Sequence, residues 1–295
     1  MFGVSAALTT PFDTDGSIAH ARLEKHIGKA LGDGCTSVTF FGTTGEGASV
    51  SVGERRDAVA SAVGAGFDAD RFILTLHGAA AGDVIDQIRA ARAMGVRRFL
   101  LPPPCYFAAP PDDGLFNWFA QVLSPFASSD MRFILYHIPQ VIGVELPDAV
   151  VMRLANAFPG LVLGVKDSSG SLDKARGLLE LPGLEILIGD ERLLATCARL
   201  GASGTISGIA NLFPARLARV LSSGQDDDDV NALIGTVLKY PVTPAIKSLV
   251  AHKYDDPSWR NTRAPLLATT DDEHLDLAHA HDAVVASGGQ PTEVA

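Results

Sequence analysis

Short apolar runs that recur about every 30 residues constrain the fold of this chain more than any other feature. Two of them, Phe133–Leu135 and Leu161–Leu163, place apolar side chains on both faces of an extended strand. Strands of that kind occur in parallel sheets that helices cover on both sides. We therefore expect parallel strands at Val4–Leu8, Ser37–Phe41, Phe72–Leu76, Arg98–Leu101, Phe133–Tyr136, Leu161–Val165, Glu185–Ile188 and Gly204–Ser207.

The segments between these runs carry helix signals. The stretch from Ser51 to Glu54 has the Ser-x-x-Glu pattern of a capping box, which predicts a helix start. Asp83–Met94 has the apolar spacing of an amphipathic helix, and Leu146-Pro147 indicates the start of another. Strands and helices therefore alternate along the chain.

Eight strand–helix units within about 220 residues fit a (β/α)₈ TIM barrel, a fold that usually takes about 250 residues. An open, doubly wound sheet is the rival, but its glycine-rich turn should follow the first strand, where Thr9–Phe12 stands instead. We therefore predict an α/β barrel over residues 1–223.

Residues 224–295 are predicted to form a helical extension of the barrel. The acidic run Asp226–Asp229 suits the N-terminus of a helix, where negative charge favours the helix dipole. Three helices are expected, at Val230–Tyr240, Thr243–His252 and Asp271–Val285.

Composition excludes several classes of protein. The 34 acidic residues exceed the 24 basic ones, and the formal net charge of −10 argues against a nucleic-acid or anionic-membrane surface. A hydrophobic content of 47% with 20% charged residues excludes intrinsic disorder as the main state. Because no secretory signal is evident and Cys35, Cys105 and Cys197 have no metal-ligand spacing, we expect reduced thiols in a cytoplasmic protein.

Lys166 is the foremost candidate for chemistry. It follows the apolar run Leu161–Val165, whereas the other six lysines are expected on helices: Lys25, Lys29, Lys174, Lys239, Lys247 and Lys253. If its side chain points into the barrel, desolvation favours a neutral amine that can form a Schiff base with a ketone. A solvent-facing lysine just past a strand end is the alternative.

Two further motifs fall at strand ends on the same face. Tyr136 ends the neighbouring strand, where a phenol can pass protons or simply hydrogen-bond at the barrel mouth. The run Gly42-Thr43-Thr44-Gly45 offers two hydroxyls and backbone N–H groups that suit a carboxylate, although it also fits a tight turn.

These motifs, in this order, resemble the family of dihydrodipicolinate synthase and N-acetylneuraminate lyase, the pyruvate-dependent class I aldolases. The resemblance covers nearly the whole chain and rests on Thr9–Phe12, Gly42–Glu46, Tyr136–Pro139, Gly164–Asp167 and Gly204–Ser207.

The resemblance implies a lyase in which Lys166 forms a Schiff base with pyruvate or another 2-keto acid, and an aldehyde is the second partner. It implies that Tyr136 shuttles protons, that Thr43 and Thr44 hold the keto-acid carboxylate, and that Thr43 also joins a proton relay. Gly45 belongs to the same loop, and Gly189 and Ile206 match positions that line the keto-acid pocket. No metal or organic cofactor is implied, and relatives are commonly homotetramers built as dimers of dimers.

Three departures bear on the second substrate and on the relay. Val141 stands where the lysine-biosynthetic members have an arginine that grips a carboxylate, which counts against dihydrodipicolinate synthesis. Gly47 replaces their usual serine. Tyr106 is the candidate third member of the relay, but if Phe107 occupies that place, water must replace it.

The second substrate stays open at this stage. Gln140 and His137 suit a hydroxylated substrate, whereas Val141, Ile142 and Phe107 suit an apolar aldehyde. A 4-hydroxy-tetrahydrodipicolinate synthase, a 2-keto-3-deoxy sugar acid dehydratase and a non-catalytic keto-acid sensor on the same fold are the alternatives. A metal-dependent aldolase using His77 and His137 is a further rival, but neither histidine has a spaced ligand partner.

Overall fold

Eight parallel strands close into a barrel in the computed structural model, which describes residues 2–288. Each strand pairs with the next, and β8 pairs with β1, so the sheet has no free edge. The strands are β1 (Gly3–Ala7), β2 (Ser37–Phe40), β3 (Phe72–Thr75), β4 (Arg98–Leu101), β5 (Arg132–His137), β6 (Val162–Asp167), β7 (Glu185–Ile188) and β8 (Gly204–Ser207). The predicted (β/α)₈ barrel is confirmed.

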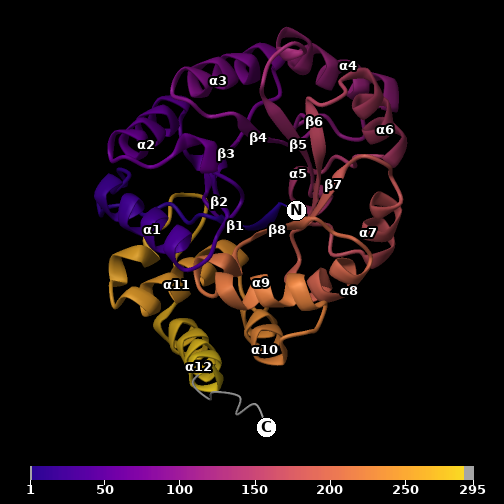
Figure 1. Ribbon diagram of the computed structural model, residues 1–295. Helices are drawn as coiled ribbons and strands as arrows, with labels where there is room; N and C mark the ends of the chain where they lie inside the picture. The colour runs from indigo at the N-terminus through magenta and orange to yellow at the C-terminus, as the bar shows by residue number, and fades with distance from the viewer. Residues whose placement is uncertain (1, 289–295) are drawn as a thin grey trace.

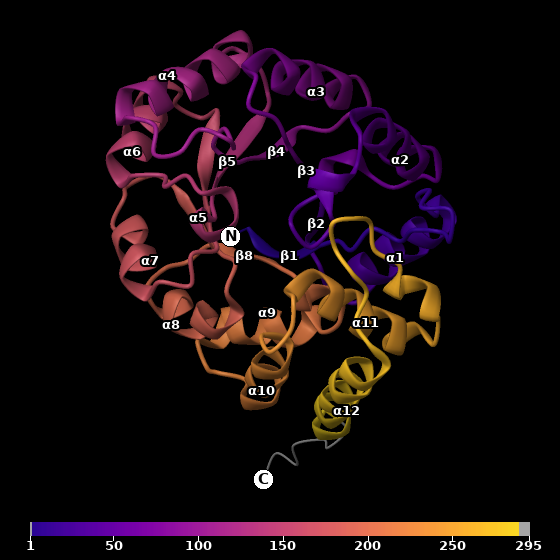
Figure 2. The same cartoon turned by 180° about the vertical axis from the view of Figure 1, so that it is seen from behind.

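A ring of helices surrounds the barrel in both views (Figure 1, Figure 2). The predicted capping box is confirmed, because Ser51 and Glu54 bond each other's backbone at the start of α2. The helices of the ring are α1 (His20–Gly32), α2 (Val52–Gly64), α3 (Ala81–Ala93), α4 (Asp112–Leu123), α6 (Asp148–Ala157), α7 (Leu172–Leu179), α8 (Leu194–Arg199) and α9 (Pro214–Ser223). The single turn α5 (Pro139–Ile142) follows β5 and lies inside the ring, at the barrel mouth.

Three more helices follow α9 and lie beside it and α1, outside the ring (Figure 1). They are α10 (Asp228–Val237), α11 (Val242–Tyr254) and α12 (Asp271–Ser287), with a short 3₁₀ turn at Pro257–Arg260 between the last two. Asp227 caps α10, so the acidic run does mark a helix start. The last seven residues of the predicted extension, 289–295, lie outside the described residues.

Two apolar cores explain why the strands are apolar on both faces. Ile134 and Tyr136 of β5 point into the barrel, where they pack with residues such as Leu100 and Leu187. Phe133 and Leu135 point the other way, into the layer between the strands and the helices. Side chains on a strand alternate between its faces, so both cores draw on the same short segment.

The extension is tied to the barrel by a buried polar seam. The His26 ring of α1 contacts the Tyr254 hydroxyl of α11 at 2.8 Å and the Asn211 side-chain oxygen at 2.8 Å. Asn211 also donates to the Ala7 carbonyl of β1 at 2.8 Å. This seam joins the two predicted units, residues 1–223 and residues 224–295. Their division into separate units stays a prediction.

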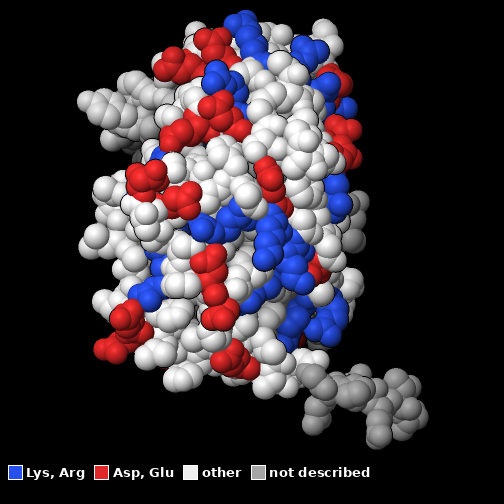
Figure 3. Space-filling model, turned by 90° about the vertical axis from the view of Figure 1, so that its left-hand side faces the viewer, with Lys and Arg blue, Asp and Glu red and all other residues white. Residues whose placement is uncertain are grey.

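Charges of both signs are spread over the outer surface. Figure 3 shows Lys and Arg side chains among Asp and Glu on the face that it displays. None of the described helices is long and apolar enough to cross a membrane.

The seam predicts how stability depends on pH. Burial lowers the pKa of the His26 imidazole from 6.5 to about 4. Between these values the unfolded chain binds the proton more readily than the folded one, so stability is lost as the pH falls from 6.5 towards 4. Urea unfolding should give a free energy about 2 kcal/mol lower at pH 5 than at pH 7 from His26 alone.

The variant His26→Gln should lose this part of the pH dependence, whatever its stability at pH 7. The variant His279→Gln changes an exposed histidine on α12 and should keep the parent slope. Equal slopes for the parent and His26→Gln would contradict the assignment.

Candidate active site

A cavity of about 420 Å³ opens where the strands end. Residues that follow five different strands line it, which is how barrel enzymes build their sites. They include Thr43, Thr44, Tyr136, Lys166, Ser168, Gly189, Glu191, Ile206 and Gly208, with Thr243 and Ile246 of α11 closing one side.

Tyr136 and Lys166 stand side by side in this cavity because their strands are in register. Tyr136 of β5 pairs with Lys166 of β6, and the Lys166 ammonium donates to the phenol oxygen at 3.3 Å. The Lys166 nitrogen also lies 4.4 Å from the centre of the Tyr136 ring. Their side chains are almost fully buried, at 5% and 3% exposed. The inward orientation is therefore the one that the structure has, and the solvent-facing alternative for Lys166 is wrong.

Thr43 completes a row of three polar groups. Its hydroxyl lies 3.5 Å from the Tyr136 hydroxyl, which also accepts the bond from Lys166. Burial by itself would raise the pKa of the Tyr136 phenol, but the Lys166 charge and hydrogen bonds with Thr43 and Ser168 outweigh it, so the pKa lies below its ordinary value. A phenol of this kind exchanges protons readily with a neighbouring amine.

The loop after β2 holds the two threonines by backbone bonds. Gly45 and Gly47 both donate their N–H groups to the Gly42 carbonyl at 3.1 Å, so the Gly45 N–H is engaged within the turn. The Thr243 hydroxyl of α11 donates to the Thr43 carbonyl at 3.1 Å. Thr44 lines the cavity beside Thr43. The loop therefore presents side-chain hydroxyls from a fixed backbone.

A buried ion pair anchors this loop, and sequence reasoning missed it. Glu46, whose backbone is left-handed at φ 53°, pairs with Lys247 of α11, and both side chains are 0% exposed. Its second oxygen accepts the Arg263 backbone N–H at 2.9 Å. Burial lowers the pKa of Lys247 to about 8, although Glu46 opposes that shift. From the sequence, Lys247 is expected to be an ordinary helical lysine, but its side chain is more buried than that of Lys166. Lys239, which is also expected on a helix, lies in the turn after α10.

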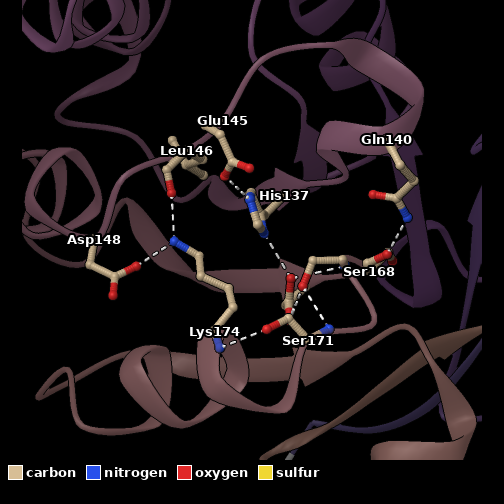
Figure 4. A network of polar contacts seen from close by, with 10 residues as sticks. His137, Gln140, Glu145, Leu146, Asp148, Ser168, Ser171 and Lys174 are labelled. Atoms are coloured by element: carbon tan, nitrogen blue, oxygen red, sulfur yellow. Dashed lines mark hydrogen bonds and ion pairs between the residues drawn. The ribbon is translucent and has the colours of Figure 1, made fainter.

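His137 does not enter the cavity, contrary to the expectation that it contacts substrate. It follows Tyr136 on the strand and so points to the other face. Its ring lies 2.8 Å from Asp167 and 2.7 Å from Glu145, as Figure 4 shows for Glu145. In the same view the Gln140 amide donates to the Ser168 carbonyl at 2.6 Å, which fixes the loop after β6.

Tyr106 lies away from the row of polar groups. Its side chain is 92% exposed and its backbone is left-handed at φ 83°, while the neighbouring Phe107 is 53% exposed. Among the described residues, no hydrogen bond joins Tyr106 to Thr43 or Tyr136. Val141 is 58% exposed and lines the cavity with Gln140.

A second cavity of about 470 Å³ adjoins the first and shares Thr43, Tyr136 and Val141 with it. His77 lines it, and burial lowers the pKa of this imidazole to about 4, assisted by the charge of Arg55. The structure requires glycine at position 47, because a Cβ there would collide with the Phe41 carbonyl and the His77 ring.

Glu191 is a further group of the first cavity that the sequence did not single out. It bonds the Ser207 hydroxyl and accepts the Ile209 N–H at 3.3 Å. Burial raises the pKa of this carboxyl. The sequence could have indicated this residue, because Glu191 lies two residues beyond Gly189 in the segment after β7, where barrel enzymes place site residues.

The comparisons with known proteins agree with this geometry. Residues 1–283 match the model of the dihydrodipicolinate synthetase family. The chain belongs to this family. It is therefore a lyase of the class I aldolase type, since members use a lysine Schiff base with pyruvate.

Similar proteins match over more than four fifths of their length. A DapA-like lyase of Chloroflexus aurantiacus is 32% identical, with 96% of this chain and 97% of that protein covered. A 4-hydroxy-tetrahydrodipicolinate synthase of Methanothrix thermoacetophila is 30% identical, with 84% and 81% covered. The crystal structure of dihydrodipicolinate synthase from Agrobacterium tumefaciens is 44% identical and superposes with a TM-score of 0.92, covering 96% of this chain and 99% of that one.

Because Glu46 and Lys247 form a buried ion pair, we predict that removing one of the two charges destabilises the protein strongly. Glu46→Gln leaves the Lys247 ammonium buried without its counter-charge, which should lower the free energy of unfolding by about 3–5 kcal/mol. Chemical denaturation measures this directly. Asp86→Asn is the matched control, because Asp86 pairs with Arg89 on the exposed side of α3, at 75% exposure, and its loss should cost about 1 kcal/mol or less.

The double variant Glu46→Gln, Lys247→Met should recover part of the loss, since it also removes the stranded charge. Similar losses in Glu46→Gln and Asp86→Asn would show that the buried pair does not anchor the loop.

Proposed function

We propose that Lys166 is the residue of this lyase that condenses with the ketone of pyruvate or a similar 2-keto acid. Its position inside the barrel and its bond to Tyr136 carry the proposal. The amine nitrogen attacks the ketone carbon, water leaves, and the resulting imine withdraws electrons from the neighbouring carbon. Loss of a proton from that carbon gives an enamine, which adds to an aldehyde; the reverse sequence cleaves the same bond.

Tyr136 moves the protons of this sequence. As the phenolate it takes one proton from the Lys166 ammonium, which frees the amine, and the phenol so formed gives that proton to the hydroxyl that leaves as water. Its lowered pKa supports this role, and so does its contact with the Thr43 hydroxyl. Thr43 and Thr44 hold the keto-acid carboxylate from the anchored loop, while Gly189 and Ile206 shape the pocket around it.

The second substrate is proposed to be an aldehyde without a carboxylate. Val141 offers no charge at the rim of both cavities. The arginines that line the cavities among the described residues are engaged: Arg192 with Asp190 in two bonds, and Arg55 with Gly47 and Gln87. A carboxylate on the aldehyde would therefore lack a bidentate partner.

Dehydration of a hydroxylated 2-keto acid is the second candidate, and Glu191 favours it. A buried carboxyl with a raised pKa can hold a proton for a departing hydroxyl group. Both reactions begin with the same imine at Lys166.

We also propose that the protein acts as a homotetramer, a dimer of dimers, in the cytoplasm. The exposed Tyr106 and Phe107 side chains at the barrel mouth support a subunit contact there. In that assembly Tyr106 can complete the relay from Tyr136 and Thr43 only from a neighbouring subunit.

Reductive trapping tests the role of Lys166. Incubation with pyruvate and borohydride should give one covalent adduct per chain, detected as an intact-mass increase and mapped to the peptide that carries Lys166. The variant Lys166→Met should give none, while Lys25→Met, at an exposed lysine, should be labelled like the parent. An adduct mapped to Lys247, or equal labelling of Lys166→Met, would overturn the assignment.

Turnover separates a lyase from a sensor in the same preparation. The parent should release pyruvate from 2-keto-3-deoxy acids or consume it with an aldehyde, in a coupled assay for pyruvate. Trapping without turnover across a panel of such substrates would favour the sensor.

Val141→Arg tests the choice of aldehyde. The new guanidinium should raise kcat/KM for an aldehyde that carries a carboxylate by about tenfold to a hundredfold, the value of a charge-assisted hydrogen bond. Val141→Met adds a side chain of similar length without charge and should give no increase. A parent enzyme that already prefers the carboxylate-bearing aldehyde would contradict the proposal.

A further inference from the structure

Three side chains of types that bind metals meet between α11 and α12, and none of them lines the cavity at the barrel mouth. They are His252 in the last turn of α11 and the adjacent residues His281 and Asp282 of α12. One donor atom from each lies within 4.8 Å of the other two. Among the described residues this is the one such cluster, and nothing in the proposed reaction uses it.

The Asp282 carboxylate is the centre of the cluster. One of its oxygens lies 2.7 Å from Nε2 of His252 and 3.2 Å from Nδ1 of His281. The two imidazoles are 5.2 Å apart between ring centres and nearly perpendicular, at 83°. Both rings therefore aim a nitrogen at the same carboxylate from different directions.

Neighbouring groups hold these rings in place. The Phe213 ring packs on His281 at 5.1 Å between centres. His274, about two helical turns before His281 on the same face of α12, lies 6.2 Å from His252 and is bonded through Nδ1 to the Ser248 hydroxyl at 2.7 Å. His281 is also the least exposed of the three, at 9% of its side chain.

We propose that His252, His281 and Asp282 bind one divalent transition-metal ion of the Zn²⁺ class, with water in the fourth position. Two imidazole nitrogens and one carboxylate oxygen form a ligand set that suits Zn²⁺ and Co²⁺. A single carboxylate is too few oxygen ligands for Ca²⁺ or Mg²⁺. The ion takes the place of the hydrogen bonds between Asp282 and the two rings: each neutral ring carries its proton on its other nitrogen and presents an unprotonated nitrogen, and small shifts of the three side chains bring the donors to bonding distance.

The ion would act as a clamp on the helical extension. It would join the last turn of α11 to α12, and the first turns of α11 carry Thr243 and Lys247, which contact the loop of Thr43. Because the ion binds the folded chain and not the unfolded one, it should raise the melting temperature. None of the three proposed ligands lines the cavity around Lys166.

Titration of the metal-free protein tests the proposal. After treatment with a chelator and its removal, Co²⁺ should develop the visible absorption of a bound ion at one equivalent per chain, and Zn²⁺ should displace it. Zn²⁺ should also raise the melting temperature of the same sample. His252→Gln, which removes one ligand, should weaken Zn²⁺ binding by at least about tenfold and abolish the thermal shift.

His279→Gln is the matched control, since His279 is an exposed histidine on the same helix outside the cluster. It should bind Co²⁺ and Zn²⁺ like the parent. Two results would overturn the proposal: no binding at one equivalent by the parent, or equal weakening in His279→Gln and His252→Gln. Asp282→Asn, which keeps the bonds to both rings but removes the charge, should also bind weakly, and unchanged binding there would contradict the ligand set.

Discussion

The pairing of β5 with β6 is the constraint on which the site depends. Because a strand alternates its side chains, the register that puts Tyr136 beside Lys166 inside the barrel also puts His137 beside Asp167 outside it. The inner pair is buried, in contact and open to the cavity, whereas the outer pair packs among the loops that support it. A shift of one residue would exchange the two pairs and remove the amine from the cavity.

The helical extension takes part in the site as well as in the fold. Thr43 and Thr44 are fixed by Thr243 and, through Glu46, by Lys247 and Arg263, all of which lie beyond residue 223. Lys247 and Arg263 also flank the Phe12 ring, each with its cationic group about 4.3–4.4 Å from the ring centre. The carboxylate-holding loop is therefore positioned by groups about 200 residues away, and changes in the extension should reach the keto-acid pocket.

Much of the fold could be predicted from the sequence because strands such as Arg98–Leu101 and Glu185–Ile188 carry a local signal in their apolar runs. Lys166 could be found because it breaks such a run. His137 was misplaced although the same alternation predicts its outward direction. Lys247 could not be recognised, since its burial arises from contact with Glu46 across 201 residues and leaves no local pattern. The contact between His252 and Asp282 was hidden for the same reason.

A crystal structure of the protein soaked in pyruvate is the most direct test of the imine at Lys166. Continuous electron density should join Nζ of Lys166 to the second carbon of pyruvate, with the carboxylate on Thr43 and Thr44 and the Tyr136 hydroxyl beside the new bond. Density joined to Lys247, or pyruvate bound without a covalent bond in the cavity, would contradict the assignment of Lys166 as the nucleophile.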